Sequence, residues 1–227
     1  MRKVEKIDGL VPVKNAVITV FDKSGLDILV PGLINTCPDI KIYSTGGTYK
    51  KIVEFLGDNA EKYIQEVSKY TGLPETEGGL VKTLHHKLFL GYLTEKYSTA
   101  HQRDLERENA VPIDLFVGNL YPFKQVIASE NVDIEDARMN IDIGGPSALR
   151  AVAKNWHRVA TLIDPNDYLM LLNEIKENKG STTPQTRFEL HKKVFRHTGN
   201  YDMAIADFVD PIPFEEAKKS YTILNEK

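Results

Sequence analysis

The chain has 227 residues, of which 41% are hydrophobic and 27% charged, and its net charge at pH 7 is −3. This composition excludes a disordered chain, and the scattered basic residues argue against a nucleic-acid or membrane-surface binder. No apolar run approaches the roughly 20 residues of a membrane span. The lone cysteine, Cys37, cannot form an internal disulfide, and the N-terminus is charged. We therefore expect a reduced, cytoplasmic protein built on one large α/β domain.

The first half of the chain alternates short apolar runs with helical patterns. Residues 16–21 and 40–44 are predicted strands, and each leads through a glycine-containing turn into a helix, over 26–33 and 49–56 respectively. Residues 63–67 are a candidate edge strand. Buried strands that alternate with helices indicate a parallel sheet.

The second half supplies two more predicted strands, at 113–120 and 158–163, which brings the sheet to about five strands. The polar stretch 94–109 is either a surface loop or an exposed helix. Residues 166–208 are expected to be mainly helical, with a break near 180–184. The predicted organisation is an N-terminal extension at 1–13, a domain at 14–208 and an irregular tail at 209–227.

The segment Ile141-Asp142-Ile143-Gly144-Gly145-Pro146 is the first candidate site. A carboxylate between β-branched apolar residues tends to lose its hydration, which raises its pKa and makes it a better base. Pro146 suits the first position of a helix, whose unpaired amides would then face Asp142. Ser147, Arg150 and Lys154 would share one face of that helix. The alternative is that Asp142 is an ordinary turn residue before two glycines.

A second candidate site is the turn Ser44-Thr45-Gly46-Gly47-Thr48, which joins a predicted strand to a helix. Its hydroxyls, glycines and helix N-terminal amides can form a phosphate cradle at the edge where open α/β folds bind ligands. Lys23, at the end of the first strand, would add positive charge. A tight turn and a solvated lysine are the competing explanations.

Two further segments end near the same edge. Lys82 follows a glycine pair and can donate to a developing oxyanion, with Thr83 beside it. Asn119 and Tyr121 follow the predicted strand at 113–120. The adjacent His85 and His86 lack the spacing of a metal pair, so we predict no metal site.

These motifs together resemble the IMP cyclohydrolase domain of the bifunctional purine-biosynthesis enzyme. The similarity covers about residues 14 to 208 and rests on the order and spacing of five segments, 22–25, 44–48, 81–85, 119–123 and 141–155. The resemblance implies a methylglyoxal-synthase-like three-layer α/β sandwich with a C-terminal helical extension. The family's formyltransferase domain would follow near residue 208, so we expect a stand-alone cyclohydrolase.

The resemblance also implies a reaction, closure of 5-formamidoimidazole-4-carboxamide ribotide to IMP with loss of water and without metal or cofactor. Asp142 would assist deprotonation of the carboxamide nitrogen, Lys82 would stabilise the oxygen that leaves as water, and Tyr121 and Lys154 would support them. The remaining implied contacts bind the substrate and its phosphate: Lys23, Ser44, Thr45, Gly46, Gly47, Thr48, Thr83, Asn119, Gly144 and Gly145. The implied partners are a second copy of the chain and a separate formyltransferase that makes the substrate.

The chain departs from the family pattern in three places. Leu80 replaces an arginine, Phe21 replaces a serine, and residues 85–91 read His-His-Lys-Leu-Phe-Leu-Gly. Because a hydrogen bond to a charged group contributes about 1.5–3 kcal/mol, these changes could weaken binding or alter base preference. The alternatives are therefore a nucleotide-binding regulatory module without turnover and methylglyoxal synthase itself, which shares the 44–48 loop but is usually shorter.

Overall fold

The computed structural model describes residues 3–74, 76, 82–130 and 132–224. At its centre is a five-stranded sheet of order β4-β3-β2-β5-β6, in which every neighbouring pair is parallel. The strands are β2 (Asn15–Thr19), β3 (Lys41–Ser44), β4 (Ile64–Glu66), β5 (Leu115–Gly118) and β6 (Ala160–Leu162). The five predicted strands are confirmed, and β4 lies at an edge as expected.

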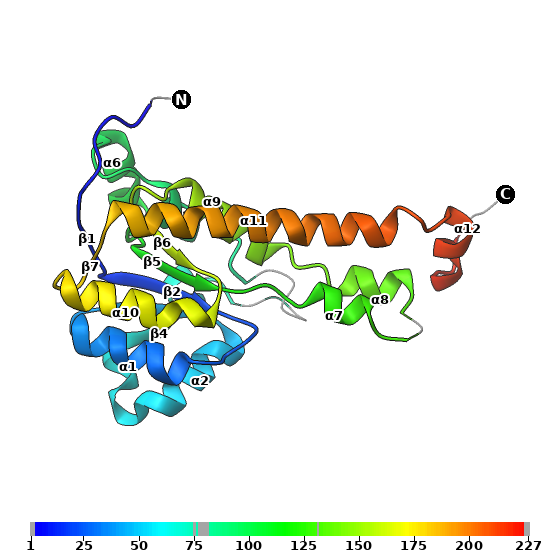
Figure 1. Ribbon diagram of the computed structural model, residues 1–227, viewed down its shortest axis with the longest axis horizontal. Helices are drawn as coiled ribbons and strands as arrows, with labels where there is room; N and C mark the ends of the chain where they lie inside the picture. Colours follow the sequence, from blue (N-terminus) through cyan, green and yellow to red (C-terminus); the bar gives the residue numbers. More distant parts are fainter. Residues whose placement is uncertain (1–2, 75, 77–81, 131, 225–227) are drawn as a thin grey trace.

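Helices cover both faces of the sheet, which makes the predicted three-layer sandwich (Figure 1). Alternate residues of β2 enter the two cores: Ala16 and Ile18 face one side, and Val17 faces the other. The first core contains α1 (Leu26–Thr36), α2 (Gly46–Leu56) and α10 (Tyr168–Glu177). The second contains α5 (His86–Leu93), α9 (Gly144–Lys154) and α11 (Pro184–Val209).

The stretch 94–109, which the sequence left undecided, contains helix α6 (Thr99–Arg107). The hydroxyl of Ser98 caps it by accepting from the His101 amide at 3.4 Å. Two short helices flank β4, namely α3 (Ala60–Tyr63) and α4 (Val67–Thr71). None of the helices in the described part of the chain is long and apolar enough to cross a membrane.

The N-terminal extension is tied to the body by a second, two-stranded sheet. In it β1 (Val11–Pro12) pairs antiparallel with β7 (Ser181–Thr182), which occupies the predicted break between α10 and α11. The fully buried Arg187 reinforces this junction, because its guanidinium donates to the carbonyls of Thr182 and Asp8. The extension thus packs against the domain.

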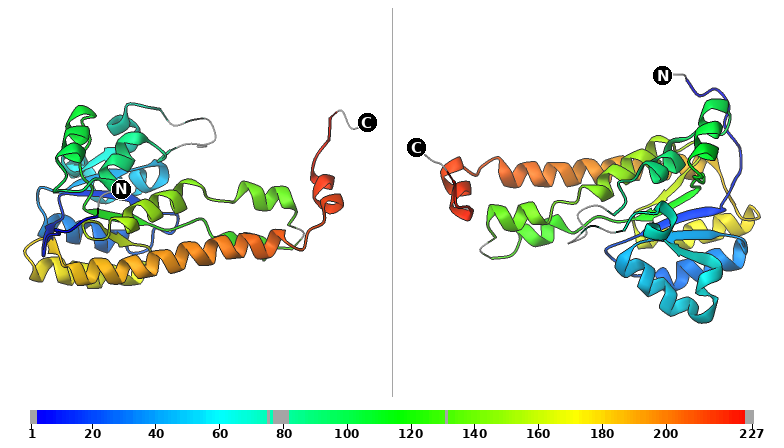
Figure 2. Two further views of the ribbon diagram at one scale, coloured as in Figure 1. Left: turned by 90° about the horizontal axis from the view of Figure 1, so that it is seen from above. Right: turned by 180° about the vertical axis from the view of Figure 1, so that it is seen from behind.

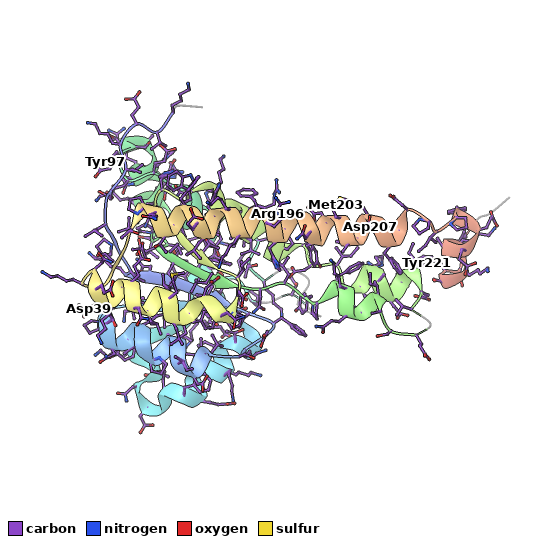
Figure 3. All side chains as sticks on the ribbon, viewed as in Figure 1. Asp39, Tyr97, Arg196, Met203, Asp207 and Tyr221 are labelled. Atoms are coloured by element: carbon purple, nitrogen blue, oxygen red, sulfur yellow. The ribbon has the colours of Figure 1, made fainter. Side chains whose placement is uncertain are left out.

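The C-terminal half of α11 projects beyond the sandwich, as both views in Figure 2 show. Beside it lie α7 (Phe123–Ile127) and α8 (Ile134–Met139). At the tip is α12 (Phe214–Ala217), a short helix in the tail that was expected to be irregular. We call α7, α8, α12 and the C-terminal half of α11 the arm. Tyr221, labelled in Figure 3, fastens the tail to α8 by donating to Glu135 Oε2 at 2.6 Å.

A buried ion pair holds the start of the central strands. Asp114 accepts from Arg158 Nη2 at 2.6 Å and from the backbone amides of Lys14 and Asn15 at 3.0 and 2.9 Å. Both side chains are about nine-tenths buried. Burial raises the pKa of Asp114, and the attraction of Arg158 opposes that rise.

Candidate active site

The carboxyl ends of β2, β3 and β5 open on a pocket of about 440 Å³. Thr19 of β2 pairs with Gly118 of β5, and both line it. Because the chain continues from β2 to β3 on one side while β5 lies on the other, this is the switch point at which parallel sheets bind ligands. The predicted site residues in its lining are Lys23, Thr45, Gly46, Gly47, Thr48, Lys82, Thr83, Asn119, Tyr121, Asp142, Gly144 and Gly145.

One end of the pocket is formed by the N-terminus of α2. Gly46 has φ +46°, a left-handed conformation that glycine adopts at little cost. The first amides of a helix have no intrahelical partner, and α2 has neither an acidic residue in its first turn nor a side-chain cap. This end of the pocket therefore offers backbone donors and a positive helix terminus to an anion.

Two lysines border these glycines. A Cβ placed on Gly47 would lie 3.5 Å from Lys23 Cε, and one placed on Gly46 would lie 3.8 Å from Lys82 Nζ. Lys23 comes from the loop after β2, whereas Lys82 comes from the segment before α5, and both side chains line the pocket. The α2 end is therefore the cationic end of the pocket.

The hydroxyl groups of the predicted phosphate cradle form hydrogen bonds within the protein. Ser44 is fully buried, does not line the pocket, and donates to the Ile18 carbonyl at 2.6 Å. Thr48 Oγ1 accepts from the Val20 amide at 3.1 Å and donates to the Val20 carbonyl at 3.0 Å. Thr45 Oγ1 lies 3.0 Å from Thr19 Oγ1. These contacts fasten α2 to the end of β2, beside the glycines and lysines of the cationic end.

Asn119 organises the loop that carries Lys23. Its Oδ1 accepts from the amides of Phe21 and Asp22 at 2.6 and 3.0 Å, and its Nδ2 donates to the Asp22 carbonyl at 3.0 Å. The amide of Asn119 is thus engaged with the backbone. Asn119 therefore positions the loop that carries Lys23, and it also lines the pocket, where the family resemblance implies a substrate contact.

Asp142 lies at the opposite end of the pocket, beside the N-terminus of α9. Its Oδ1 accepts from the Gly145 amide at 2.8 Å, and the Tyr121 amide also donates to the carboxylate. Burial raises the pKa of Asp142, and these two amide bonds partly oppose the rise. The predicted desolvation is present, but Ile143 is 63% exposed, so it does not arise from packing of both flanking isoleucines. The carboxylate occupies the α9 terminus and leaves the α2 terminus for an anion.

The glycine pair permits this geometry. A Cβ on Gly145 would overlap the Asp142 carboxylate and lie 2.7 Å from Leu120 Cδ2. A Cβ on Gly144 would lie 3.1 Å from Thr83 Oγ1. Lys82 and Thr83 therefore run from the α2 glycines to the α9 glycines and connect the two ends of the pocket. Helix α9 begins at Gly144, so Pro146 is its third residue rather than its first.

Large apolar side chains surround the mouth of the pocket. The rings of Phe21 and Tyr121 meet edge to face, with centroids 5.4 Å apart, and each side chain is about half exposed. Met139 and Ile143, which are 70% and 63% exposed, also line it. A ligand with a planar ring would cover apolar surface here while its anionic group reached the glycines.

Lys154 lies outside the pocket. It is the last residue of α9, its side chain is exposed, and it does not line the pocket. Arg150, on the same face, places its guanidinium 5.7 Å from the centre of the Phe195 ring of α11. Asp142 lies beside the first turn of α9 and Lys154 is the last of its 11 residues, roughly 15 Å along the helix, so the structure does not bring Lys154 to Asp142. The substitution at Leu80 lies outside the described residues.

The histidines serve structural purposes in the contacts they make. His85 Nδ1 accepts from the Lys87 amide at 3.1 Å and caps α5, and His101 Nδ1 accepts from the Glu95 amide at 3.1 Å. Within the described residues, no three His, Cys, Asp or Glu side chains gather as metal ligands do.

Sequence reasoning missed Tyr201, whose hydroxyl accepts from the Asp142 amide at 2.8 Å. The two residues are far apart in the sequence, and no local pattern links them.

Comparison with known families agrees with this architecture. A model of the MGS-like domain matches residues 35–147, which include the α2 glycines and Asp142. A model described as the AICARFT/IMPCHase bienzyme matches residues 152–226. The first match covers most of the pocket, and the second covers α10, α11 and the tail.

Curated relatives and a solved structure give the same result. The bifunctional purine biosynthesis protein PurH of Acidithiobacillus ferrooxidans is 42% identical over 88% of this chain, and that of Bacillus subtilis is 41% identical over 95%. The matched regions are 37% and 40% of those proteins, so the chain spans about two fifths of their length. The crystal structure of ForH superposes with a TM-score of 0.71 and 29% identity, over 85% of this chain and 97% of ForH.

Proposed function

The chain belongs to the family of the bifunctional purine biosynthesis proteins PurH and carries an MGS-like domain, and from this premise we propose that it closes 5-formamidoimidazole-4-carboxamide ribotide to IMP with loss of water. One observation carries the proposal. A partly desolvated carboxylate, Asp142, shares a pocket with a glycine-lined, cationic helix terminus. The substrate has the matching groups, an amide that must lose a proton and a phosphate that needs an anion site.

The phosphate would bind at the cationic end. The amides of Gly46 and Gly47 supply uncharged donors, and Lys23 and Lys82 border the same glycines. Because Asp142 occupies the other helix terminus, a second anion is repelled there. The ribotide therefore has one favoured direction in the pocket, with its heterocycle toward Asp142 and the aromatic pair Phe21 and Tyr121.

The reacting groups belong to one molecule, so the protein has to select the folded conformer and move protons. Asp142 takes a proton from the carboxamide nitrogen while that nitrogen bonds to the formyl carbon. The formyl oxygen gains two protons, which match the one taken from the carboxamide nitrogen and the one lost by the formamido nitrogen. The carbon–oxygen bond then breaks, water leaves, and the carbon forms a double bond to the formamido nitrogen. No oxidant or reductant is consumed. A base with a raised pKa suits the first step because it retains the proton better than an ordinary aspartate.

Lys82 would stabilise the oxygen on which charge develops. It belongs to the segment that runs from the α2 glycines to the α9 glycines, between the phosphate end and the base. One well-aimed donor to an oxyanion contributes about 3–4 kcal/mol, and a positioned base contributes about 10²–10⁴ in rate. Loss of Lys82 or Asp142 should therefore reduce turnover severely, and loss of Asp142 should leave the phosphate contacts in place.

The test uses purified protein and the formylated ribotide, with IMP formation followed by absorbance and IMP binding measured by calorimetry. Conversion at an enzymatic rate supports the proposal. IMP binding without conversion contradicts it and favours the regulatory nucleotide-binding module, for which the loss of a family hydroxyl at Phe21 is the supporting observation. Neither binding nor conversion would reject both.

A further inference from the structure

Helix α11 reaches the candidate active site through one side chain. Its buried residues recur at three- and four-residue intervals, as Leu190, Val194, Tyr201 and Ala204 illustrate. The opposite face carries Met203, which is 59% exposed and is labelled in Figure 3 between Arg196 and Asp207. Tyr201 is 8% exposed and lies on the side that packs on the domain.

The hydroxyl of Tyr201 contacts two backbone groups of the segment that carries Asp142. It accepts from the Asp142 amide at 2.8 Å and lies 3.5 Å from the Asn140 carbonyl, to which it donates. The bond to Asp142 has a normal length for a good hydrogen bond, whereas that to Asn140 is at the long limit. The main restraint is therefore on the amide of the proposed base itself.

The ring that carries this hydroxyl is fixed in place. Phe123, 1% exposed in α7, meets the Tyr201 ring edge to face at 6.2 Å and meets Phe208 of α11 in the same way. Aromatic pairs of this geometry contribute beyond their buried area. The hydroxyl thus has a defined position set by α7 and α11.

The neighbours of Asp142 in this segment are held by α8, α9 and the core: the Asn140 and Ile141 amides donate to carbonyls of α8, Ile141 packs on the second core, and the Ile143 carbonyl accepts from Ser147. The segment joins α8 to α9, and the flanking Met139 and Ile143 are 70% and 63% exposed. On the side chain of Asp142, the bonds come from the Gly145 and Tyr121 amides. Those bonds orient the carboxylate, and the bond to the Tyr201 hydroxyl restrains the backbone amide of Asp142 itself.

We propose that Tyr201 is a positioning residue for the proposed base Asp142. Its hydroxyl, carried by α11, restrains the backbone of Asp142 and thereby determines where the carboxylate lies. The inference rests on the proposed cyclohydrolase function. Proton transfer needs the base within about 2.6–3.2 Å of the proton-bearing nitrogen. A hydroxyl that restrains the backbone of the base therefore affects the chemical step more than substrate binding.

The test compares Tyr201→Phe with Tyr70→Phe. Tyr70 is a matched control because it is 9% exposed and its hydroxyl also accepts from a backbone amide, that of Val111 at 2.9 Å, outside the pocket. Each variant loses one short bond from a backbone amide, and Tyr201→Phe also loses the long bond to the Asn140 carbonyl, so their melting temperatures should fall by similar amounts. We expect kcat of Tyr201→Phe to fall by roughly 10- to 100-fold, with KM and IMP affinity unchanged. Tyr70→Phe should keep the kcat of the wild type.

A wild-type kcat in Tyr201→Phe, or an equal loss in Tyr70→Phe, would overturn the inference. Failure of the wild type to form IMP would instead reject the proposed function, so the two failures are distinguishable. Amide hydrogen exchange of the wild type gives a measurement that needs no variant. The Asp142 amide should be strongly protected, and exchange at the rate of an unbonded loop amide would also overturn the inference.

Discussion

The amide of Gly145 donates to Asp142 Oδ1 at 2.8 Å, and any side chain on Gly145 would overlap that carboxylate. The hydrogen bond and the missing Cβ are two aspects of one arrangement. The carboxylate can lie against the N-terminus of α9 only because residue 145 has no side chain. Gly145, in the first turn of α9, therefore helps to position the carboxylate of the proposed base.

Gly145→Ala should abolish most turnover. The new methyl group would overlap both the Asp142 carboxylate and Leu120, so the carboxylate has to move and loses its bond to the Gly145 amide. Steady-state assays of IMP formation check this. The control is Gly199→Ala in α11, where a Cβ meets nothing within 4 Å and should stabilise the helix by roughly 0.5–1 kcal/mol without loss of activity. A fully active Gly145→Ala variant would contradict the proposed position of the base.

Phe21→Ser should weaken IMP binding by about tenfold, because the half-exposed ring that packs on Tyr121 would no longer cover the heterocycle. Calorimetric titration with IMP measures the change. Phe214→Ser, in α12 outside the pocket, is the control and should bind as the wild type does. Stronger binding by Phe21→Ser would mean instead that a hydroxyl at this position contacts the ligand and that the ring does not.

The rate should depend on the ionisation of Asp142. Burial raises its pKa above the ordinary aspartate value, and a base works only when deprotonated. The acid limb of the kcat/KM profile should therefore have its midpoint above the usual aspartate range, with activity lost as the pH falls through it. A midpoint at or below the ordinary value would contradict the desolvation of the carboxylate.

The same shift predicts an effect on stability. A raised pKa means that the folded state binds the proton more tightly, so this contribution is present at low pH and lost as the pH rises through the folded pKa. At neutral pH the ionised carboxylate costs stability. Asp142→Asn should consequently be at least as stable as the wild type there.

Arg158→Ala should destabilise the fold by about 3–5 kcal/mol at neutral pH, because it leaves the buried Asp114 carboxylate without its counter-ion. The pKa of Asp114 is already raised by burial and rises further in the variant, so the deficit should narrow as the pH falls. Urea unfolding at two pH values checks both statements. Lys192→Ala, which breaks an exposed pair with Glu189, should cost at most about 1 kcal/mol.

The sheet was predictable from the sequence because strands buried on both faces leave continuous apolar runs. Helix α6 was not, since only Leu105 among its residues is buried and the rest of the helix is polar. The flanks of Asp142 were also misleading: the residue type of Ile143 suggests burial, yet the turn directs it outward.

In the candidate site too, some features have a local signal in the sequence and others depend on the fold. The glycine turns and Asp142 carry local signals, and the topology brings them to one edge of the sheet. Lys154 lies at the end of α9 opposite to Asp142, so the helical face that it shares with Ser147 and Arg150 does not bring it to the base. The bond from Tyr201 to Asp142 joins distant segments, so only the folded structure reveals it.

The most direct test of the proposed function compares the wild type with Asp142→Asn, which keeps the shape of the side chain and removes its basicity. We expect the wild type to convert the formylated ribotide to IMP and the variant to lose about 10²–10⁴ in kcat while it binds IMP with unchanged affinity. Equal turnover by the two proteins would contradict Asp142 as the base and, with it, the proposed mechanism.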